Sequence, residues 1–157
     1  MTARYVEQLD RTKRYLKRFT DLTNGIPHTH DTQYYDDEVY AFFQNCYHLK
    51  DWIIHDPICH KWSSVEKFIN SDKDLQICAD ICNNQKHLKL TKSPRSKENP
   101  EFAGGIINLN IRENLGGDSS VGIAISYEVS TNSGNIDAFA LATRCVNSWV
   151  TFIASNT

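Results

Sequence analysis

Apolar positions in the first ninety residues recur every three or four places, with polar side chains between them. Such a stripe is the pattern of an amphipathic helix with one face in a core. It predicts four helices, over residues 2–22, 37–55, 64–70 and 73–90. Asp36 is expected to cap the second of these helices, and Ser63 or Ser64 the third, because short polar side chains accept hydrogen bonds from the free N–H groups at a helix start.

The period changes from helical spacing to strict alternation after residue 105. In the stretch 106–112, Ile107, Leu109 and Ile111 alternate with polar residues, and apolar residues recur at every second position again over 121–129. Alternation is typical of a strand, whose successive side chains point to opposite faces. The two runs predict an antiparallel hairpin joined through a Gly-Gly turn. A hairpin alone is marginally stable, so its apolar face is expected to rest on the helices.

Helical spacing returns over 135–154, where Asn135 is expected to serve as the N-cap. The stretch 91–104 holds two prolines and many charges but little to bury, which predicts a mobile surface loop. Together these elements predict one α+β domain over residues 1–157, mainly α. We expect a bundle of four to five helices, with one β-hairpin inserted before the C-terminal helix.

The 157 residues carry a net charge of −2, and they contain neither an apolar run of about 20 residues nor the apolar stretch of a signal peptide. We therefore expect a cytoplasmic protein that does not engage a membrane. Four of the five cysteines, Cys46, Cys78, Cys82 and Cys145, lie within apolar-periodic segments, as small buried hydrophobic residues do. In such a compartment they are expected to be reduced. Their spacing does not match a structural zinc site, so we expect no metal and no cofactor.

Two helices carry polar clusters opposite their apolar stripes. In each cluster the side chains recur at three- and four-residue spacing, which places them on one helix face. The second helix contributes His48, Asp51 and His55, and the fourth contributes Asp80, Asn83 or Asn84, and His87. An imidazole beside a carboxylate is suited to general acid–base catalysis if the two faces converge. The alternatives are two solvated faces, or hydrogen bonds that only join the helices.

The first helix bears a cluster of basic residues: Arg4, Arg11, Arg14, Lys17 and Arg18. Lys and Arg side chains that neutralise phosphates give salt-dependent binding that ignores sequence. The cluster predicts contact with a nucleic acid or an acidic protein. A face that is only solvated is the alternative, because Glu7 and Asp10 interrupt the basic residues.

The stretches FFQNCYHLKDWI (42–53) and DICNNQKHLKL (80–90) resemble a group of uncharacterised bacterial proteins, in which a His-Leu-Lys-Asp-Trp helix is followed by an Asp-x-x-Asn-x-x-Lys-His helix. This resemblance implies no particular activity. The chain is also loosely similar to HEPN domains, helical bundles of toxin and defence systems, many of which cut RNA. Their signature separates an Arg from a His by four to six residues on one helix. Before His87 those positions hold Cys82, Ile81 and Asp80, so the Arg that would hold the scissile phosphate is missing.

The favoured hypothesis is a small accessory or regulatory domain that binds a protein or nucleic-acid partner. The alternative is a HEPN-like ribonuclease, or another acid–base enzyme that uses the His/Asp/Asn cluster. Self-association is the third hypothesis, indicated by large aromatic residues that an interface could use: Tyr34, Tyr35, Tyr40, Trp52 and Trp149.

Overall fold

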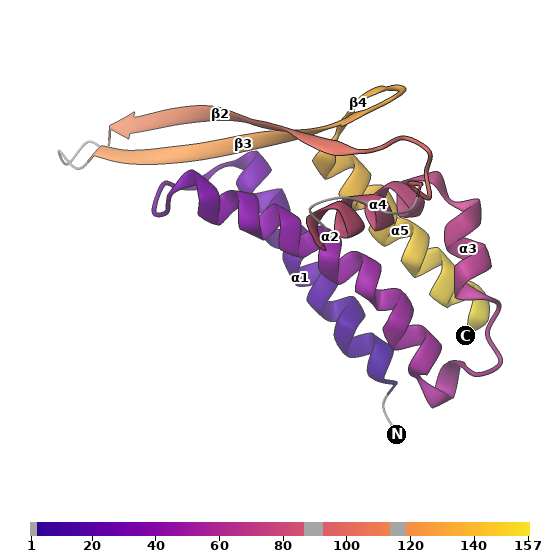
Figure 1. Cartoon of the computed structure of the whole chain (residues 1–157). Coiled ribbons are helices and arrows are strands. Elements are labelled where there is room, and N and C mark those ends of the chain that lie inside the picture. Colours follow the sequence, from indigo (N-terminus) through magenta and orange to yellow (C-terminus); the bar gives the residue numbers. More distant parts are fainter. Residues whose placement is uncertain (1–2, 87–92, 114–118) are drawn as a thin grey trace.

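The computed structural model describes residues 3–86, 93–113 and 119–157, and two long helices form its N-terminal third. α1 (Arg4–Asn24) and α2 (Thr32–His55) lie side by side and run in opposite directions (Figure 1). Ala3 occupies the N-cap position of α1, so this helix has no capping side chain of its own. Asp56, just beyond α2, accepts a hydrogen bond from the Tyr5 N–H at 3.1 Å and so caps α1 from the neighbouring helix.

The second helix starts before the predicted residue 37, at Thr32. The prediction of Asp36 as its N-cap is wrong, because Asp31 holds that position and accepts from the Tyr34 N–H at 2.9 Å. Asp36 lies in the second helical turn, where its carboxylate accepts a hydrogen bond from the Tyr127 hydroxyl at 2.7 Å. Both aspartates precede the apolar stripe, so the cap pattern alone does not distinguish them.

A 3-10 turn and three helices complete the bundle: η1 (Pro57–Cys59), α3 (Val65–Ser71), α4 (Lys73–Lys86) and α5 (Ala138–Asn156). Ser64 caps α3, in agreement with the sequence. Asp137 caps α5 in place of the predicted Asn135, which lies in a short strand that leads into the helix. Residues 87–90 of the predicted fourth helix are outside the described ranges.

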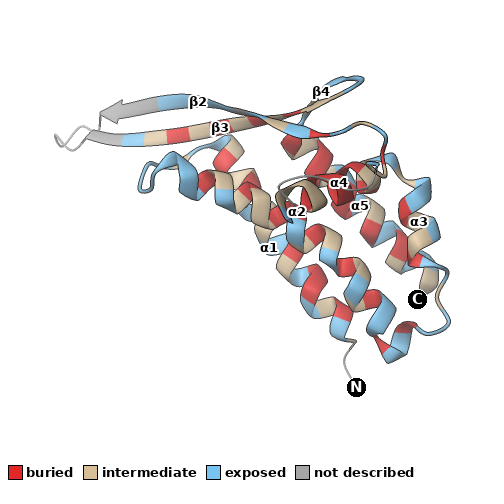
Figure 2. Cartoon of the chain, in the orientation of Figure 1, coloured by how far each residue is buried: buried red, intermediate tan, exposed pale blue. Residues whose placement is uncertain are grey.

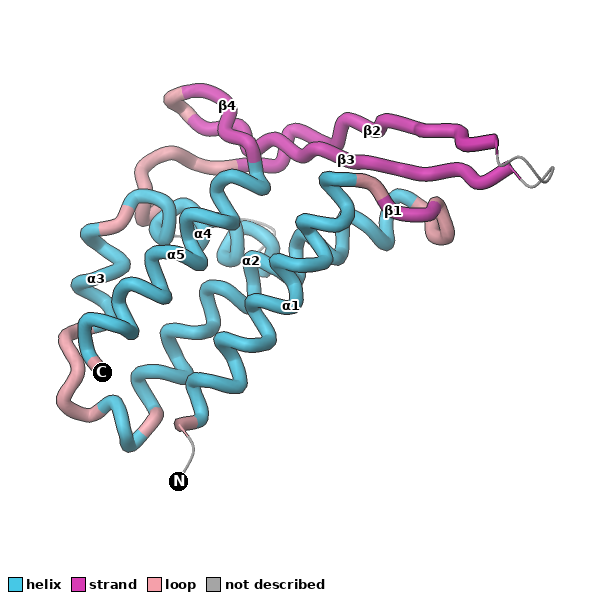
Figure 3. The backbone as a smooth tube through the Cα atoms, turned by 180° about the vertical axis from the view of Figure 1, so that it is seen from behind, coloured by secondary structure: helices cyan, strands magenta, loops and turns pink. Residues whose placement is uncertain are grey.

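An antiparallel sheet covers one end of the bundle (Figures 1 and 3). Its central strand, β3 (Ser119–Thr131), pairs along one edge with β2 (Glu101–Glu113). Along the other edge β3 pairs with two short strands, β1 (Ile26–Pro27) and β4 (Gly134–Asp137). The hairpin was therefore predicted correctly in kind, but its strands are longer than 106–112 and 121–129. The short strands were missed because runs of two and four residues are too brief for alternation to be detected.

The helix-facing side of β3 continues the core of the bundle (Figure 2), and its buried residues are Ile123, Ile125, Tyr127 and Val129. On β2, Gly105 lies opposite Tyr127, and a Cβ there would come within 2.9 Å of the Ile125 side chain. Glycine is needed at this position because the Tyr127 ring and Ile125 fill the space. Farther along, the hairpin extends past the helices, as Figure 1 shows.

The chain between α4 and β2 is held at several points. Because β2 begins at Glu101, the predicted loop 91–104 ends earlier than expected, and its residues 91 and 92 are not described. The Arg95 guanidinium forms an ion pair with Glu66 at 2.9 Å, and Asn84 donates to the Pro100 carbonyl at 2.8 Å. The sequence pattern of charges and prolines gave no sign of these contacts.

The arrangement confirms an α+β fold, mainly α, with the hairpin placed before the C-terminal helix. None of the helices within the described ranges is both long and apolar enough to cross a bilayer.

Candidate functional site

The polar face of α2 points into solvent. His48, Asp51 and His55 are all exposed. Two imidazoles in the described ranges do form hydrogen bonds, but they are His30, with the Thr29 hydroxyl, and His60, with the Pro57 carbonyl. The structure therefore does not bring the predicted α2 residues into an acid–base pair.

The predicted residues of α4 are dispersed. Asp80 is 3% exposed, and its two carboxylate oxygens accept hydrogen bonds from the backbone N–H groups of Arg95 and Ser96, each at 2.7 Å. Asp80 therefore lies neither on a solvated face nor in a hydrogen bond between the two helices: the segment before β2 folds over it, and its N–H groups supply the donors that a buried carboxylate needs. Asn83 is half-buried, and His87 lies outside the described residues. A catalytic role for the six-residue cluster stays a prediction.

α2 and α4 are nevertheless neighbours. The Gln44 side-chain amide donates to the Gln85 carbonyl oxygen at 3.1 Å across the seam between them. Burial raises the pKa of the Cys82 thiol on α4, while the charges of Lys86 and Asp51 act on it in opposite senses. The two predicted polar clusters thus lie on adjacent helices, but Asp51 is exposed to solvent.

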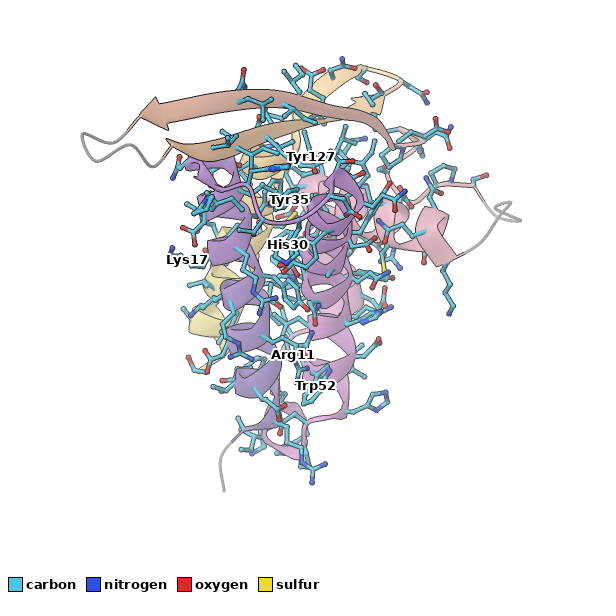
Figure 4. The ribbon with its side chains drawn as sticks, turned by 90° about the vertical axis from the view of Figure 1, so that its left-hand side faces the viewer. Arg11, Lys17, His30, Tyr35, Trp52 and Tyr127 are labelled. Carbon is cyan, nitrogen blue, oxygen red and sulfur yellow. The ribbon has the colours of Figure 1, made fainter. Side chains whose placement is uncertain are left out.

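The basic residues of α1 are partly neutralised by acidic neighbours. Arg11 forms an ion pair with Glu7 at 2.8 Å and lies over the Trp52 ring, 5.6 Å from its centre (Figure 4). Lys17 pairs with Asp21 on the same helix, and Arg18 pairs with Glu38 of α2 at 3.3 Å: three of the five predicted cations thus have acidic partners.

The remaining positive charge is concentrated at the middle of the helix. Lys13 and Arg14 are exposed, as is Arg4 at the start of the helix. In the part of the chain that is described, none of these three residues takes part in an ion pair. The surface available for an acidic partner is therefore smaller than the sequence indicates.

The outer edge of β2 is a second surface, which the sequence analysis did not single out. Among the described strands β2 pairs only with β3, so its other edge has no strand beside it. Ile106, Ile107 and Leu109 are 58%, 44% and 62% exposed there. Residues 102–111 include neither a charged residue nor a proline. Proteins usually protect a free edge with such residues, because an unpaired strand recruits other strands.

A third feature was visible only in part from the sequence. The cysteines predicted to be buried are buried, and three of them come from different helices into one cluster: Cys46 of α2, Cys78 of α4 and Cys145 of α5. Their Sγ atoms all lie within 4.8 Å of one another. The apolar stripes of the sequence predict that each cysteine is buried. They do not predict that the three cysteines are in contact, because that depends on how the helices pack.

Comparison of the chain with known protein families, curated proteins and solved structures gave no match.

Proposed function

We propose that this chain is an accessory protein-interaction domain, and that it pairs with a second copy of itself, β2 against β2. The observation that carries the proposal is the edge of β2 that has no partner among the described strands, is uncharged over residues 102–111 and has Ile106, Ile107 and Leu109 exposed. Strand addition to such an edge satisfies main-chain groups and buries alternate side chains. A twofold pair uses the same edge in both copies, so it closes without leaving a free β2 edge.

The sequence of β2 favours a second copy as the occupant. Residues 107–111 read Ile-Asn-Leu-Asn-Ile, which is the same in both directions. In an antiparallel pair with its axis at Leu109, this residue faces its own copy, Ile107 faces Ile111, and Asn108 faces Asn110. Apolar residues thus lie opposite apolar ones on one face and amides opposite amides on the other. The same register opposes Gly105 to Glu113, so no like charges meet.

The position of the hairpin permits this pairing. Ile107 and Leu109 lie opposite Ile125 and Ile123 on the helix-facing side of the sheet, yet they remain exposed because α1 and α5 pack mainly against β3 and leave the outer strand β2 uncovered. A twofold axis normal to the sheet keeps both bundles on the same side of the joint sheet. The exposed apolar residues on the helix-facing side of the two hairpins, including Val121 at 41%, then become adjacent.

Light scattering of the purified chain over a range of concentrations tests the proposal. We expect the wild type to reach twice the mass of one chain. Leu109→Lys should remain at one chain, because it places two lysines opposite each other at the axis. Ile54→Lys is the matched control, since it adds the same charge at a 48% exposed residue of α2. A wild type that stays at the mass of one chain at every concentration would refute the proposal.

Cysteine crosslinking tests the register independently. All five native cysteines are buried, so an introduced surface thiol is distinct from them. Directly opposed residues of an antiparallel pair lie about 4.5–5.5 Å apart at Cα, within reach of a disulfide. Leu109→Cys should therefore form a crosslinked pair of chains on mild oxidation. Ile107→Cys should not form one, since residue 107 of one chain lies four positions along the strands from residue 107 of the other. A crosslink in Ile107→Cys and none in Leu109→Cys would overturn the register.

We propose a second, weaker partner class for α1, the phosphate backbone of a nucleic acid. Its support is the exposure of Lys13 and Arg14 without an ion pair among the described residues. Two or three free cations on one helix provide only modest, salt-sensitive affinity.

A further inference from the structure

The thiol cluster of Cys46, Cys78 and Cys145 lies at the centre of the helical bundle. All three residues are 0% exposed, and each comes from a different helix, α2, α4 or α5. None is in a disulfide. The three helices therefore converge on three free sulfur atoms, and each sulfur is held by the packing of its own helix.

A buried donor without a partner lies beside these sulfurs. Trp149 is 0% exposed, and its indole N–H has no hydrogen-bond partner among the described residues. Buried donors are rarely left unpaired, because losing water without replacement costs free energy. Trp149 lies one turn after Cys145 on α5, so the unpaired N–H and one of the three thiols share a helix face.

The separation of the sulfurs suits a single metal ion. Three thiolates about 2.3 Å from one ion lie about 4 Å from one another in trigonal geometry. The observed limit of 4.8 Å requires inward movements of less than an ångström. Side-chain rotation at three cysteines can provide these movements without changing the helices.

We propose that Cys46, Cys78 and Cys145 form a trigonal site for one Cu(I) ion. Soft thiolates select Cu(I), zinc and iron–sulfur clusters among biological metals. Zinc sites take four ligands, and the described residues contain no fourth His, Asp, Glu or Cys ligand within this cluster. Each thiol that becomes a ligand releases its proton to solvent. The copper remains Cu(I), so no electron acceptor is needed.

Cys82 is the thiol through which the ion would enter the cluster. It lies one turn beyond Cys78 on α4, so the two side chains share a helix face, and it is 8% exposed while Cys78 is 0% exposed. An ion from solvent would therefore meet Cys82 before Cys78. Cys82 would transfer the ion without being one of its final ligands.

Anaerobic titration of the reduced, full-length chain with Cu(I), against bicinchoninate as a competing chelator, tests this site. We expect one Cu(I) per chain, an ultraviolet thiolate-to-copper absorption band and three sulfur neighbours by X-ray absorption. Cys145→Ala and Cys46→Ala should weaken binding by at least about 100-fold, because loss of even an outer-shell partner can cost that much. Cys59→Ala, which removes a buried thiol outside the cluster, should leave the affinity unchanged.

Kinetics separate the ligands from the access path, and Cys82→Ala should slow copper uptake without changing the final affinity. The proposal is overturned if folded Cys145→Ala binds Cu(I) as tightly as the wild type, or if binding occurs only with loss of helical circular dichroism. If the alanine variants do not fold, X-ray absorption of the wild type decides: nitrogen or oxygen neighbours at copper would overturn the site. Displacement of Cu(I) by equimolar Zn(II) would also overturn the assignment to copper.

Discussion

Asp51 and Asp80 have similar sequence contexts, since each lies on a helix beside histidine or asparagine at helical spacing, yet their surroundings differ. Asp51 is exposed. Asp80 is buried and holds two backbone N–H groups of the segment before β2. A pattern of polar residues predicts which residues share a helix face, but it does not predict what a later segment places over that face.

Asp80→Asn tests the structural role of this carboxylate. The variant keeps one acceptor but loses the charge and directs an NH₂ group at a backbone N–H. We expect the free energy of unfolding to fall by roughly 2–3 kcal/mol, the range for losing charge-assisted hydrogen bonds in a buried place. Urea unfolding followed by circular dichroism measures this change. Asp51→Asn should change it by less than about 0.5 kcal/mol, as is usual at the surface; similar losses in both variants would contradict the assignment.

Tyr127 gives the protein an alkaline pH dependence. Burial, with the Asp36 carboxylate bonded to the hydroxyl, raises the pKa of Tyr127 well above its ordinary value of 10.0. The unfolded chain therefore loses this proton first. The stability that the neutral phenol provides is complete below about pH 10 and is lost as the pH rises toward the folded pKa.

Tyr127→Phe should reduce that loss of stability. Above about pH 10 the free energy of unfolding of the variant should fall less steeply, by up to about 1.4 kcal/mol per pH unit for the one group removed. Urea unfolding at several alkaline pH values measures the slopes. Tyr34→Phe alters a 42% exposed residue and should follow the wild type. Parallel slopes for wild type and Tyr127→Phe would show that the phenol is not responsible.

Among the helices and strands, α1 is the element whose positive charge can be tested for binding to a nucleic acid. Lys13 and Arg14 are exposed and lack ion pairs within the described ranges. We expect weak retention of single-stranded RNA at low salt, lost in the double variant Lys13→Glu/Arg14→Glu. Two fewer phosphate contacts should also reduce the slope of log K against log salt by about 1.4. Gel-shift titration at several salt concentrations measures both quantities.

The control for this experiment is Lys61→Glu/Lys67→Glu, which makes the same charge change at two exposed residues outside α1. Equal weakening in both double variants would mean that net charge, and not the face of α1, attracts RNA. No retention of RNA by the wild type even at low salt would remove the nucleic-acid proposal.

The sequence predicted most of the helices and strands of the fold. Apolar stripes predicted the five α-helices and the hairpin, because burial of one face imposes the period on the sequence. The starts of α2 and α5 were misplaced, since Asp36 and Asn135 fit a cap as well as Asp31 and Asp137 do. β1 was missed because its pairing with Ile123 and Gly122 depends on β3, far along the chain.

At the scale of the whole molecule, packing order decides what the elements bring together. The sequence predicted that the cysteines are buried, but the meeting of Cys46, Cys78 and Cys145 depends on the contacts among α2, α4 and α5. The palindrome at 107–111 was present in the sequence throughout. It acquires meaning only when β2 is known to be an edge strand.

Hydrogen exchange can test that edge in the unmodified protein. Antiparallel strands direct alternate N–H groups to opposite sides, so within β2 every second amide faces β3 and the others face outward. In a pair of chains the outward amides between residues 105 and 113 gain partners. When nine-tenths of chains are paired, these amides should exchange about tenfold more slowly than in dilute protein. Amides of the central strand β3 are bonded in either state and should not change with concentration. Outward β2 amides that exchange equally fast at all concentrations, in a sample that scatters light as two chains, would place the interface elsewhere on the molecule.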